Sequence, residues 1–187
     1  MPQSNGVTPA TEAIPAEKSN SMYTWHRTTG KAYLTFGTGY GRTRLSAFDA
    51  AELDANIFAA NALQVTSFIP PHWQIVNSKT ALADLTDHGV FLPMAFAHAA
   101  SKTRPTAASV TIGINQDSSK ASIITEHAGE GTTREKSLRE SELALRDAFN
   151  SRHWEIDKLE QAAIEGKPRD GLYVCVLVAV VFLPDPH

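Results

Sequence analysis

The chain has 187 residues, 42% of them hydrophobic and 20% charged, a composition that indicates one globular domain with its own apolar core. Its net charge of −3, spread over mixed acidic and basic residues, excludes the basic stripe of a nucleic-acid-binding protein. The single cysteine excludes an internal disulfide, and the histidines lie at no metal-ligand spacing, so we expect no metal site.

The first residues are rich in Pro, Ser, Thr, Ala and Glu, which predicts a disordered tail over 1–21 and a folded domain over 22–187. The start of the chain lacks the basic and apolar runs of a secretory signal. The longest apolar stretch, Leu172 to Leu183, is shorter than the roughly 20 residues that a spanning helix needs. We therefore expect a cytoplasmic protein with no membrane partner.

The first predicted elements are a strand over 32–36 and a glycine-rich turn over 37–41. Ser46 is the expected N-cap of a helix over 47–60, in which apolar residues recur at helical spacing. Asp49 then falls in the first turn of that helix, where a carboxylate favours the helix dipole and the free amides. The domain is thus expected to begin with strand, turn and helix.

The rest of the chain predicts short strands and a second helix. An apolar run over 63–69 is stopped by Pro70-Pro71, and Thr132 with Glu135 has capping-box spacing at the start of the helix. Further strands are predicted at 74–76, 90–97, 109–114, 121–126 and 173–182. The last of these is dense in valine, as is typical of a central strand covered on both faces. This order of elements indicates an α/β or α+β single domain.

Several familiar chemical motifs are missing. Gly37-x-Gly39-x-Gly41 is not the dinucleotide fingerprint because its third glycine comes too early, and Gly30-Lys31 lacks the other residues of a phosphate loop. No serine lies in a G-x-S-x-G elbow. Cys175 lies inside the apolar final strand, so we expect a buried, inert thiol rather than a nucleophile.

The informative stretch runs from residue 37 to residue 71. It combines glycines, a helix start, an asparagine, a hydroxyl residue followed by serine, and a proline pair: Gly37 and Gly41, Leu45-Ser46-Ala47-Phe48-Asp49, Asn61, Thr66-Ser67 and Pro70-Pro71. A second block, Ile123-Ile124-Thr125-Glu126-His127-Ala128-Gly129, contains a candidate catalytic glutamate. In this order and spacing, the chain from about Tyr33 to Leu183 resembles the pyruvoyl-dependent arginine decarboxylase family. Thr66 stands where many members have a serine, and it keeps the hydroxyl group.

The resemblance implies a precursor that cuts its own backbone between Thr66 and Ser67. The products are a β chain of 1–66 and an α chain of 67–187, in which Ser67 has become a covalent pyruvoyl group, the cofactor of the enzyme. The implied substrate is L-arginine, which is converted to agmatine and carbon dioxide. Because an ordinary peptide bond does not cleave in this way, either the turn is strained or the oxyanion of the scissile carbonyl is stabilised.

The chemistry and the resemblance together assign roles to four further side chains. Glu126 is expected to return a proton to the carbanion if burial keeps its pKa raised. Asn61 is expected to donate to the developing oxyanion, Thr66 to position the scissile carbonyl, and Asp49 to pair with the guanidinium of arginine. The implied fold is α+β, a four-layer αββα sandwich that assembles as a trimer or a dimer of trimers, with the active site between neighbouring subunits.

Two alternatives stay open. Arg42 and Arg44 lie near the proposed substrate region, and they favour an amino acid with an acidic side chain if they point inward; as exposed turn residues they carry no such meaning. The second alternative is a homologue that stays uncut, has no activity of its own and regulates a true decarboxylase. The presence of Ser67, Asn61 and Glu126 argues against it.

Overall fold

The computed structural model describes residues 29–57, 60–77, 82 and 89–185, and the predicted N-terminal tail lies outside them. In chain order, the described elements are β1 (Gly30–Gly41), α1 (Arg44–Asp54), β2 (Asn61–Gln64), β3 (Phe68–Ile69), β4 (Gln74–Val76), β5 (Phe91–Ser101), β6 (Thr106–Asn115), β7 (Ser122–Glu130), α2 (Arg134–Asn150), β8 (Ile156–Gly166) and β9 (Tyr173–Pro184). The strands form a five-stranded sheet of order β2-β5-β9-β1-β4 and a four-stranded sheet of order β3-β7-β6-β8. Two sheets and two helices in one domain confirm the α+β prediction.

Strand β9 is the centre of the five-stranded sheet, where it runs antiparallel to both β1 and β5. Val176, Val178 and Val180 enter the apolar cluster between the two sheets. The residues that alternate with them, from Cys175 to Val181, enter the cluster beneath α1. Both faces of β9 are therefore covered, which confirms the prediction of a central strand and explains why the segment has no polar face.

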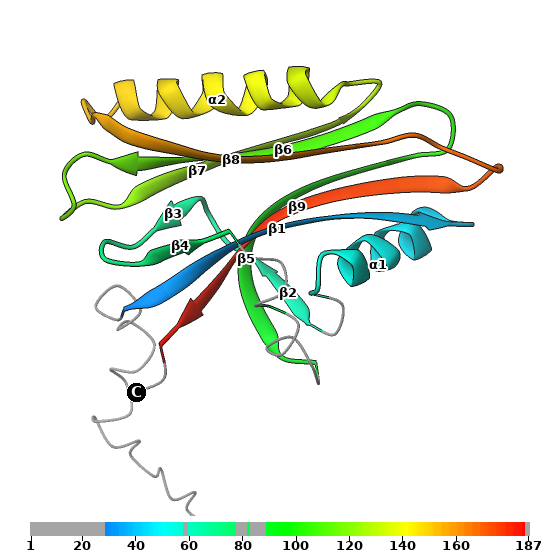
Figure 1. Ribbon diagram of the computed structural model, residues 1–187, viewed down its shortest axis with the longest axis horizontal. Coiled ribbons are helices and arrows are strands. Elements are labelled where there is room, and N and C mark those ends of the chain that lie inside the picture. Colours follow the sequence, from blue (N-terminus) through cyan, green and yellow to red (C-terminus); the bar gives the residue numbers. More distant parts are fainter. Residues whose placement is uncertain (1–28, 58–59, 78–81, 83–88, 186–187) are drawn as a thin grey trace, which may run out of the picture.

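Each helix covers the outer face of one sheet (Figure 1): α1 packs on β1, β9 and β5, and α2 packs on β6, β7 and β8. The inner faces of the sheets meet in an apolar cluster that includes Leu34 and Ile112. The buried residues Ala47 and Ala51 pack α1 on its sheet, and Phe149 packs the last turns of α2 on the other sheet. Neither described helix is long and apolar enough to cross a membrane.

The glycine-rich segment at 37–41 belongs to strand β1, so the prediction of a turn there was wrong. Gly37, Gly39 and Gly41 alternate along the strand and share the face that lies under α1. A Cβ atom on Gly39 would collide with the backbone of Ala47 and Ala51. These glycines therefore allow the helix backbone to approach the strand closely, a role that depends on the helix and not on turn geometry.

Helix α1 begins two residues before the predicted N-cap. Thr43 is the N-cap, and its hydroxyl accepts from the Ser46 amide at 3.0 Å while the Ser46 hydroxyl accepts from the Thr43 amide at 3.1 Å. Ser46 thus closes a capping box from the N3 position. The helix ends at Asp54 rather than at residue 60, and Asn56 has a left-handed φ of 59° just beyond it. Asp49 consequently lies in the second turn.

The second helix is confirmed, with its N-cap shifted by one residue. Thr133, not Thr132, accepts from the Lys136 amide at 3.2 Å, and Glu135 lies in the first turn. The sequence reading missed strand β8, which pairs antiparallel with β6 along the edge of the four-stranded sheet. Its sequence, IDKLEQAAIEG, carries charges on an exposed edge and lacks a clean two-residue alternation.

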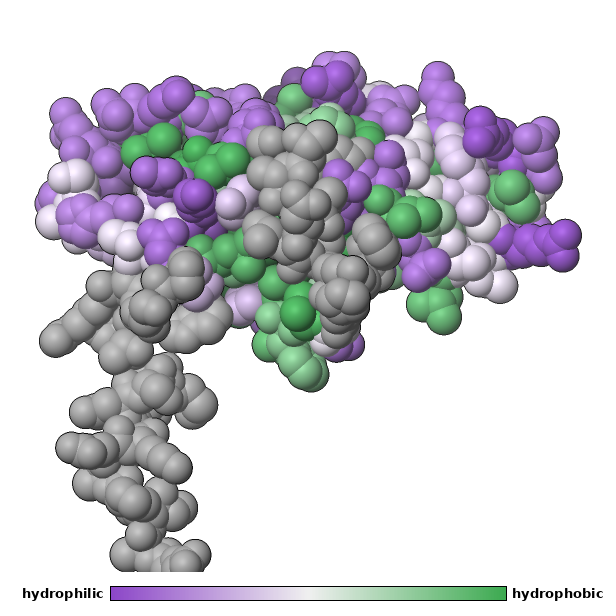
Figure 2. Space-filling view, turned by 60° about the horizontal axis from the view of Figure 1, so that its bottom comes forward, coloured by the Kyte–Doolittle hydropathy of each residue, from purple (hydrophilic) through white to green (hydrophobic). Residues whose placement is uncertain are grey.

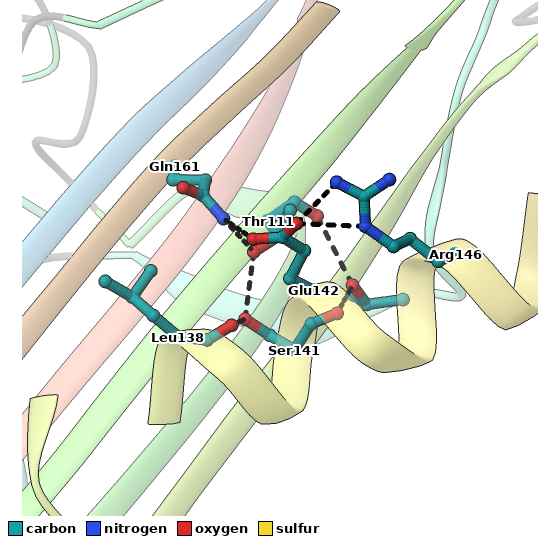
Figure 3. Close-up of polar contacts among 7 residues, drawn as sticks. Thr111, Leu138, Ser141, Glu142, Arg146 and Gln161 are labelled. Atoms are coloured by element: carbon teal, nitrogen blue, oxygen red, sulfur yellow. Dashed lines mark hydrogen bonds and ion pairs between the residues drawn. The ribbon is translucent and has the colours of Figure 1, made fainter. Parts of the chain in front are cut away.

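A seam of buried hydroxyl groups joins α2 to its sheet, as Figure 3 shows. Ser141 Oγ lies 2.9 Å from Thr111 Oγ1, and the Thr125 hydroxyl donates to the Ser141 carbonyl oxygen at 2.6 Å. Gln161 on β8 extends the seam, because its Nε2 donates to Thr111 Oγ1 at 3.2 Å. Each buried hydroxyl of this seam therefore has a partner, so α2 is seated by polar contacts as well as apolar ones.

Candidate active site

The segment around Ser67 is the place where the chain passes from one sheet to the other. Strand β2 belongs to the five-stranded sheet, and the Val65 amide after it still donates to the Met94 carbonyl oxygen at 3.1 Å. Strand β3 belongs to the four-stranded sheet, and the Ser67 carbonyl oxygen accepts from the Ile124 amide at 2.8 Å. The predicted apolar run over 63–69 is therefore two strands with the Thr66–Ser67 bond between them.

The side chains of Ser67 and Glu126 are in contact. Glu126 lies on β7 opposite Val110, and its Oε2 accepts from the Ser67 hydroxyl at 3.4 Å. Burial raises the pKa of the Glu126 carboxyl above its usual value, and the hydrogen bond from Ser67 opposes part of that shift. A half-buried carboxyl of raised pKa beside a hydroxyl can hold a proton to higher pH than an exposed glutamate and can return it to a neighbouring group.

A short turn surrounds Ser67. The Phe68 amide donates to the Thr66 carbonyl oxygen at 3.0 Å, which closes a three-residue turn with Ser67 at its centre. Among the described non-glycine residues, left-handed φ values occur at Asn56, His72, His153 and Asp170, and Ser67 is not one of them. The structure therefore has a backbone donor on the Thr66 carbonyl oxygen, and Ser67 does not have a left-handed φ. The sequence reading missed this donor because a backbone N–H leaves no signal in residue type.

In the single chain, the Asn61 side chain hydrogen-bonds to Gly89. Asn61 opens β2, and its Nδ2 donates to the Gly89 carbonyl oxygen at 2.7 Å while its backbone amide donates to Val90 at 2.7 Å. The side-chain amide thus ties the start of β2 to the residues before β5. An amide nitrogen carries two hydrogens, so a second donor is left, and the role of Asn61 in cleavage stays a prediction.

Asp49 is exposed on α1, on the outer side of the five-stranded sheet, and it is a partner of neither Ser67 nor Glu126. Its nearest electrostatic effect is on Glu52, one turn further along the helix. Burial, with a smaller contribution from Asp49, raises the pKa of Glu52 to about 7. One chain therefore places the predicted guanidinium ligand apart from the predicted cleavage site.

Two hollows adjoin these elements. An apolar one of about 250 Å³ opens beside the Thr66–Ser67 bond and is lined by Thr66, Phe68, Trp73 and their neighbours. A larger one of about 570 Å³ lies between α1 and the ends of β5 and β7, and Arg44 spans it to pair with Glu130 at 2.9 Å. The same guanidinium donates to the Ala100 carbonyl oxygen at 2.6 Å, so Arg44 has both an ion-pair partner and a backbone acceptor within the chain.

Cys175 is fully buried in β9, and burial raises the pKa of its thiol to about 12. A thiol of this kind has almost no thiolate at neutral pH, and the predicted burial of Cys175 is confirmed.

Comparison with known proteins agrees with this geometry. The family model of the pyruvoyl-dependent arginine decarboxylases matches residues 31–186. The pyruvoyl-dependent arginine decarboxylase of Methanocaldococcus jannaschii is 29% identical over 148 residues, which cover 78% of this chain and 86% of the relative. The enzyme of the same name from Methanococcus aeolicus is 32% identical over 134 residues, 71% of this chain and 78% of the relative. That of Thermococcus kodakarensis is 26% identical over 153 residues, 81% of this chain and 94% of the relative.

The matched region contains both parts of the candidate site, since it extends from the first residues of β1 to the end of β9. Thr66, Ser67, Glu126 and the two sheets that bring them together all lie within it. By its sequence over this whole span, the chain belongs to the pyruvoyl-dependent arginine decarboxylase family.

Proposed function

We propose that this chain is a precursor that cuts itself between Thr66 and Ser67 and then decarboxylates L-arginine to agmatine and carbon dioxide. The family match supports the reaction class and the substrate. The observation that carries the site is the contact between the Ser67 hydroxyl and Glu126 Oε2, at 3.4 Å, where the chain crosses between the sheets. Cleavage yields a β chain of 1–66 and an α chain of 67–187.

A pyruvoyl group derived from Ser67 fits these surroundings. The residue is half-buried, a carboxyl of raised pKa touches its side chain, and an apolar hollow lies beside it. The group supplies a ketone that captures the substrate amine and accepts the electrons released with carbon dioxide. It is made from the chain itself, so no cofactor lysine is needed.

The side chains around Ser67 then divide the remaining work. Glu126 holds the proton that replaces the lost carboxylate, because burial keeps it protonated to higher pH than an exposed glutamate. Thr66 presents the carbonyl that Ser67 attacks, and the second amide hydrogen of Asn61 is available to a neighbouring oxyanion. Asp49 pairs with the guanidinium of arginine through two parallel hydrogen bonds.

The proposed assembly is the trimer of a four-layer αββα sandwich, with each active site shared by two subunits. The separation of Asp49 from Ser67 in a single chain supports a site that a second copy completes. Apolar areas are also visible among the polar ones in Figure 2. The exposed large apolar side chains include Leu63, Val65 and Phe91, which are 46%, 37% and 69% exposed. Exposed apolar surface near a predicted site favours an interface.

The alternative of an acidic substrate has little support from Arg42 and Arg44, and Arg42 is exposed. Arg44 is paired with Glu130 and with a backbone carbonyl, so it is not a free cation waiting for a substrate carboxylate. Intact mass spectrometry distinguishes the other alternative, an uncut regulator, from the enzyme, because the regulator would stay full length.

The test combines intact mass spectrometry of the purified protein with carbon dioxide release from L-arginine and from acidic amino acids. We expect two fragments that meet at Thr66–Ser67 and activity on arginine. Ser67→Ala is expected to stay full length and inactive. The matched control is Ser122→Ala on β7, next to β3, which is expected to cleave and turn over normally. Cleaved, active Ser67→Ala protein, or an uncut wild type, refutes the proposal.

A further inference from the structure

We propose that the backbone N–H of Phe68 is the oxyanion donor that promotes self-cleavage at Thr66–Ser67. This inference rests on the proposed function, and it adds a catalytic group that no side chain reveals. The donor is already in place in the uncut chain, since the Phe68 amide lies 3.0 Å from the Thr66 carbonyl oxygen. That oxygen belongs to the bond that Ser67 attacks. Charge develops on it during the attack, and a preorganised N–H at this distance stabilises such charge.

Strand pairing explains why this N–H is available. Strand β3 pairs antiparallel with β7, with Phe68 opposite Ile123 and Ile69 opposite Ser122. Because the Ile124 amide donates to the Ser67 carbonyl oxygen, Phe68 occupies a non-hydrogen-bonded position of the ladder. Its N–H therefore points away from β7. The turn around Ser67 then brings the Thr66 carbonyl to that N–H.

Two contacts hold Phe68 in this orientation. The first is the ladder bond from Ile124 to the carbonyl of the preceding residue, at 2.8 Å. The second is on the side chain, where the guanidinium of Arg152 lies over the Phe68 ring, 5.3 Å from its centroid. Arg152 is itself fixed to the end of α2, because it donates to the Ala148 carbonyl oxygen at 2.8 Å. Backbone and ring are thus both restrained, which lets the donor act without reorganisation.

The step balances with groups of the chain and one water. The Ser67 Oγ forms a bond to the Thr66 carbonyl carbon, and the carbonyl electron pair moves to the oxygen that faces the Phe68 N–H. The carbonyl re-forms as the bond to the Ser67 nitrogen breaks, and the hydroxyl proton ends on that nitrogen, which leaves an ester. Loss of the Ser67 α-proton to solvent then expels the Thr66 carboxylate and leaves a dehydroalanine. Its imine tautomer reacts with water and releases ammonia, which leaves the ketone.

The test replaces the backbone N–H group of residue 68 by an oxygen atom. Phenyllactic acid at position 68, introduced by nonsense suppression in a cell-free translation of the full chain, keeps the benzyl side chain and exchanges the N–H for an ester oxygen. Cleavage is followed over time by intact mass, which separates cleavage after residue 66 from hydrolysis of the new ester after residue 67. We expect cleavage at Thr66–Ser67 to slow by about 100- to 1,000-fold, the usual effect of removing one oxyanion donor. A rate within about threefold of wild type overturns the inference.

Two controls distinguish the loss of the Phe68 N–H donor from a disturbance of the surrounding fold. The ester also weakens the Ser67 carbonyl as an acceptor, so the α-hydroxy analogue of isoleucine at position 124 removes that ladder bond and leaves the Phe68 N–H intact. Phe68→Ala removes the ring and keeps the N–H. Both variants loosen Phe68 but keep its N–H, so each is expected to slow cleavage by no more than about tenfold, clearly less than the Phe68 ester does. Slowing in the Ile124 variant equal to that of the Phe68 ester overturns the inference. A wild-type chain that never cleaves refutes the proposed function instead, so the two failures are distinguishable.

Discussion

The exchange of Glu126 for glutamine tests the proton donor with little change in shape. Glutamine keeps an oxygen that can accept from the Ser67 hydroxyl, at present 3.4 Å away, and has no acidic proton to give. The carboxyl is half-buried and its pKa is raised by that burial, so its neutral form is the one that the site favours. We therefore expect Glu126→Gln to cleave itself and to fail in turnover.

The size and the pH dependence of the loss follow from the same geometry. A positioned general acid contributes about 10²- to 10⁴-fold to a rate, or about 3–5 kcal/mol of barrier. Because the pKa of Glu126 is raised, its protonated fraction persists above the ordinary glutamate range and falls as the pH rises through the raised value. Wild-type turnover should fall on that alkaline limb, and the limb should be missing from the variant.

The assay measures carbon dioxide release from L-arginine across pH, with each rate divided by the amount of cleaved chain found by intact mass. Glu160→Gln on β8 is the matched control, since its carboxylate pairs with Lys158 on the same sheet and is remote from Ser67. Turnover of cleaved Glu126→Gln within about threefold of wild type, or an unchanged alkaline limb, would remove Glu126 from this role.

Three further changes test the fold. Burial raises the pKa of Glu52 in the folded protein to about 7, so its contribution to stability is largest at low pH and is lost as the pH rises through about 7. Glu52→Gln should flatten that decline by ~1 kcal/mol after discounting for its exposure, as urea unfolding at about pH 5 and pH 8 would reveal. Ser141→Ala should cost about 1–3 kcal/mol in urea unfolding, because it breaks the hydroxyl seam that seats α2; an unchanged midpoint contradicts the role of the seam. Gly39→Ala should cost about 1–3 kcal/mol or more through its collision with α1, and a thermal unfolding curve like that of wild type would refute the close approach.

The sequence by itself determined the parts whose signal is local. The valine-dense final segment has no polar face, and such a strand can be stable only when both faces are covered, as β9 is. The serine after a hydroxyl residue, the proline pair and the glutamate of the second block were readable as residue types in a fixed order. Both Ser67 and Glu126 were therefore site candidates before the structure, whereas their contact across 59 residues is a finding of the structure.

Only the tertiary structure decided how backbone groups and remote faces meet. From the sequence alone, the glycines at 37–41 indicate a turn. In the structure they lie under α1, and the close approach of this helix leaves no room for a Cβ atom. Strand β8 forms because β6 offers it a partner, and its charged sequence alone does not require a strand. The Phe68 N–H faces the scissile carbonyl because of ladder register, and Asp49 lies on another face because α1 packs on the other sheet. The direction of a backbone N–H and the face on which a side chain lies are properties of the folded backbone, so the residue types alone do not reveal them.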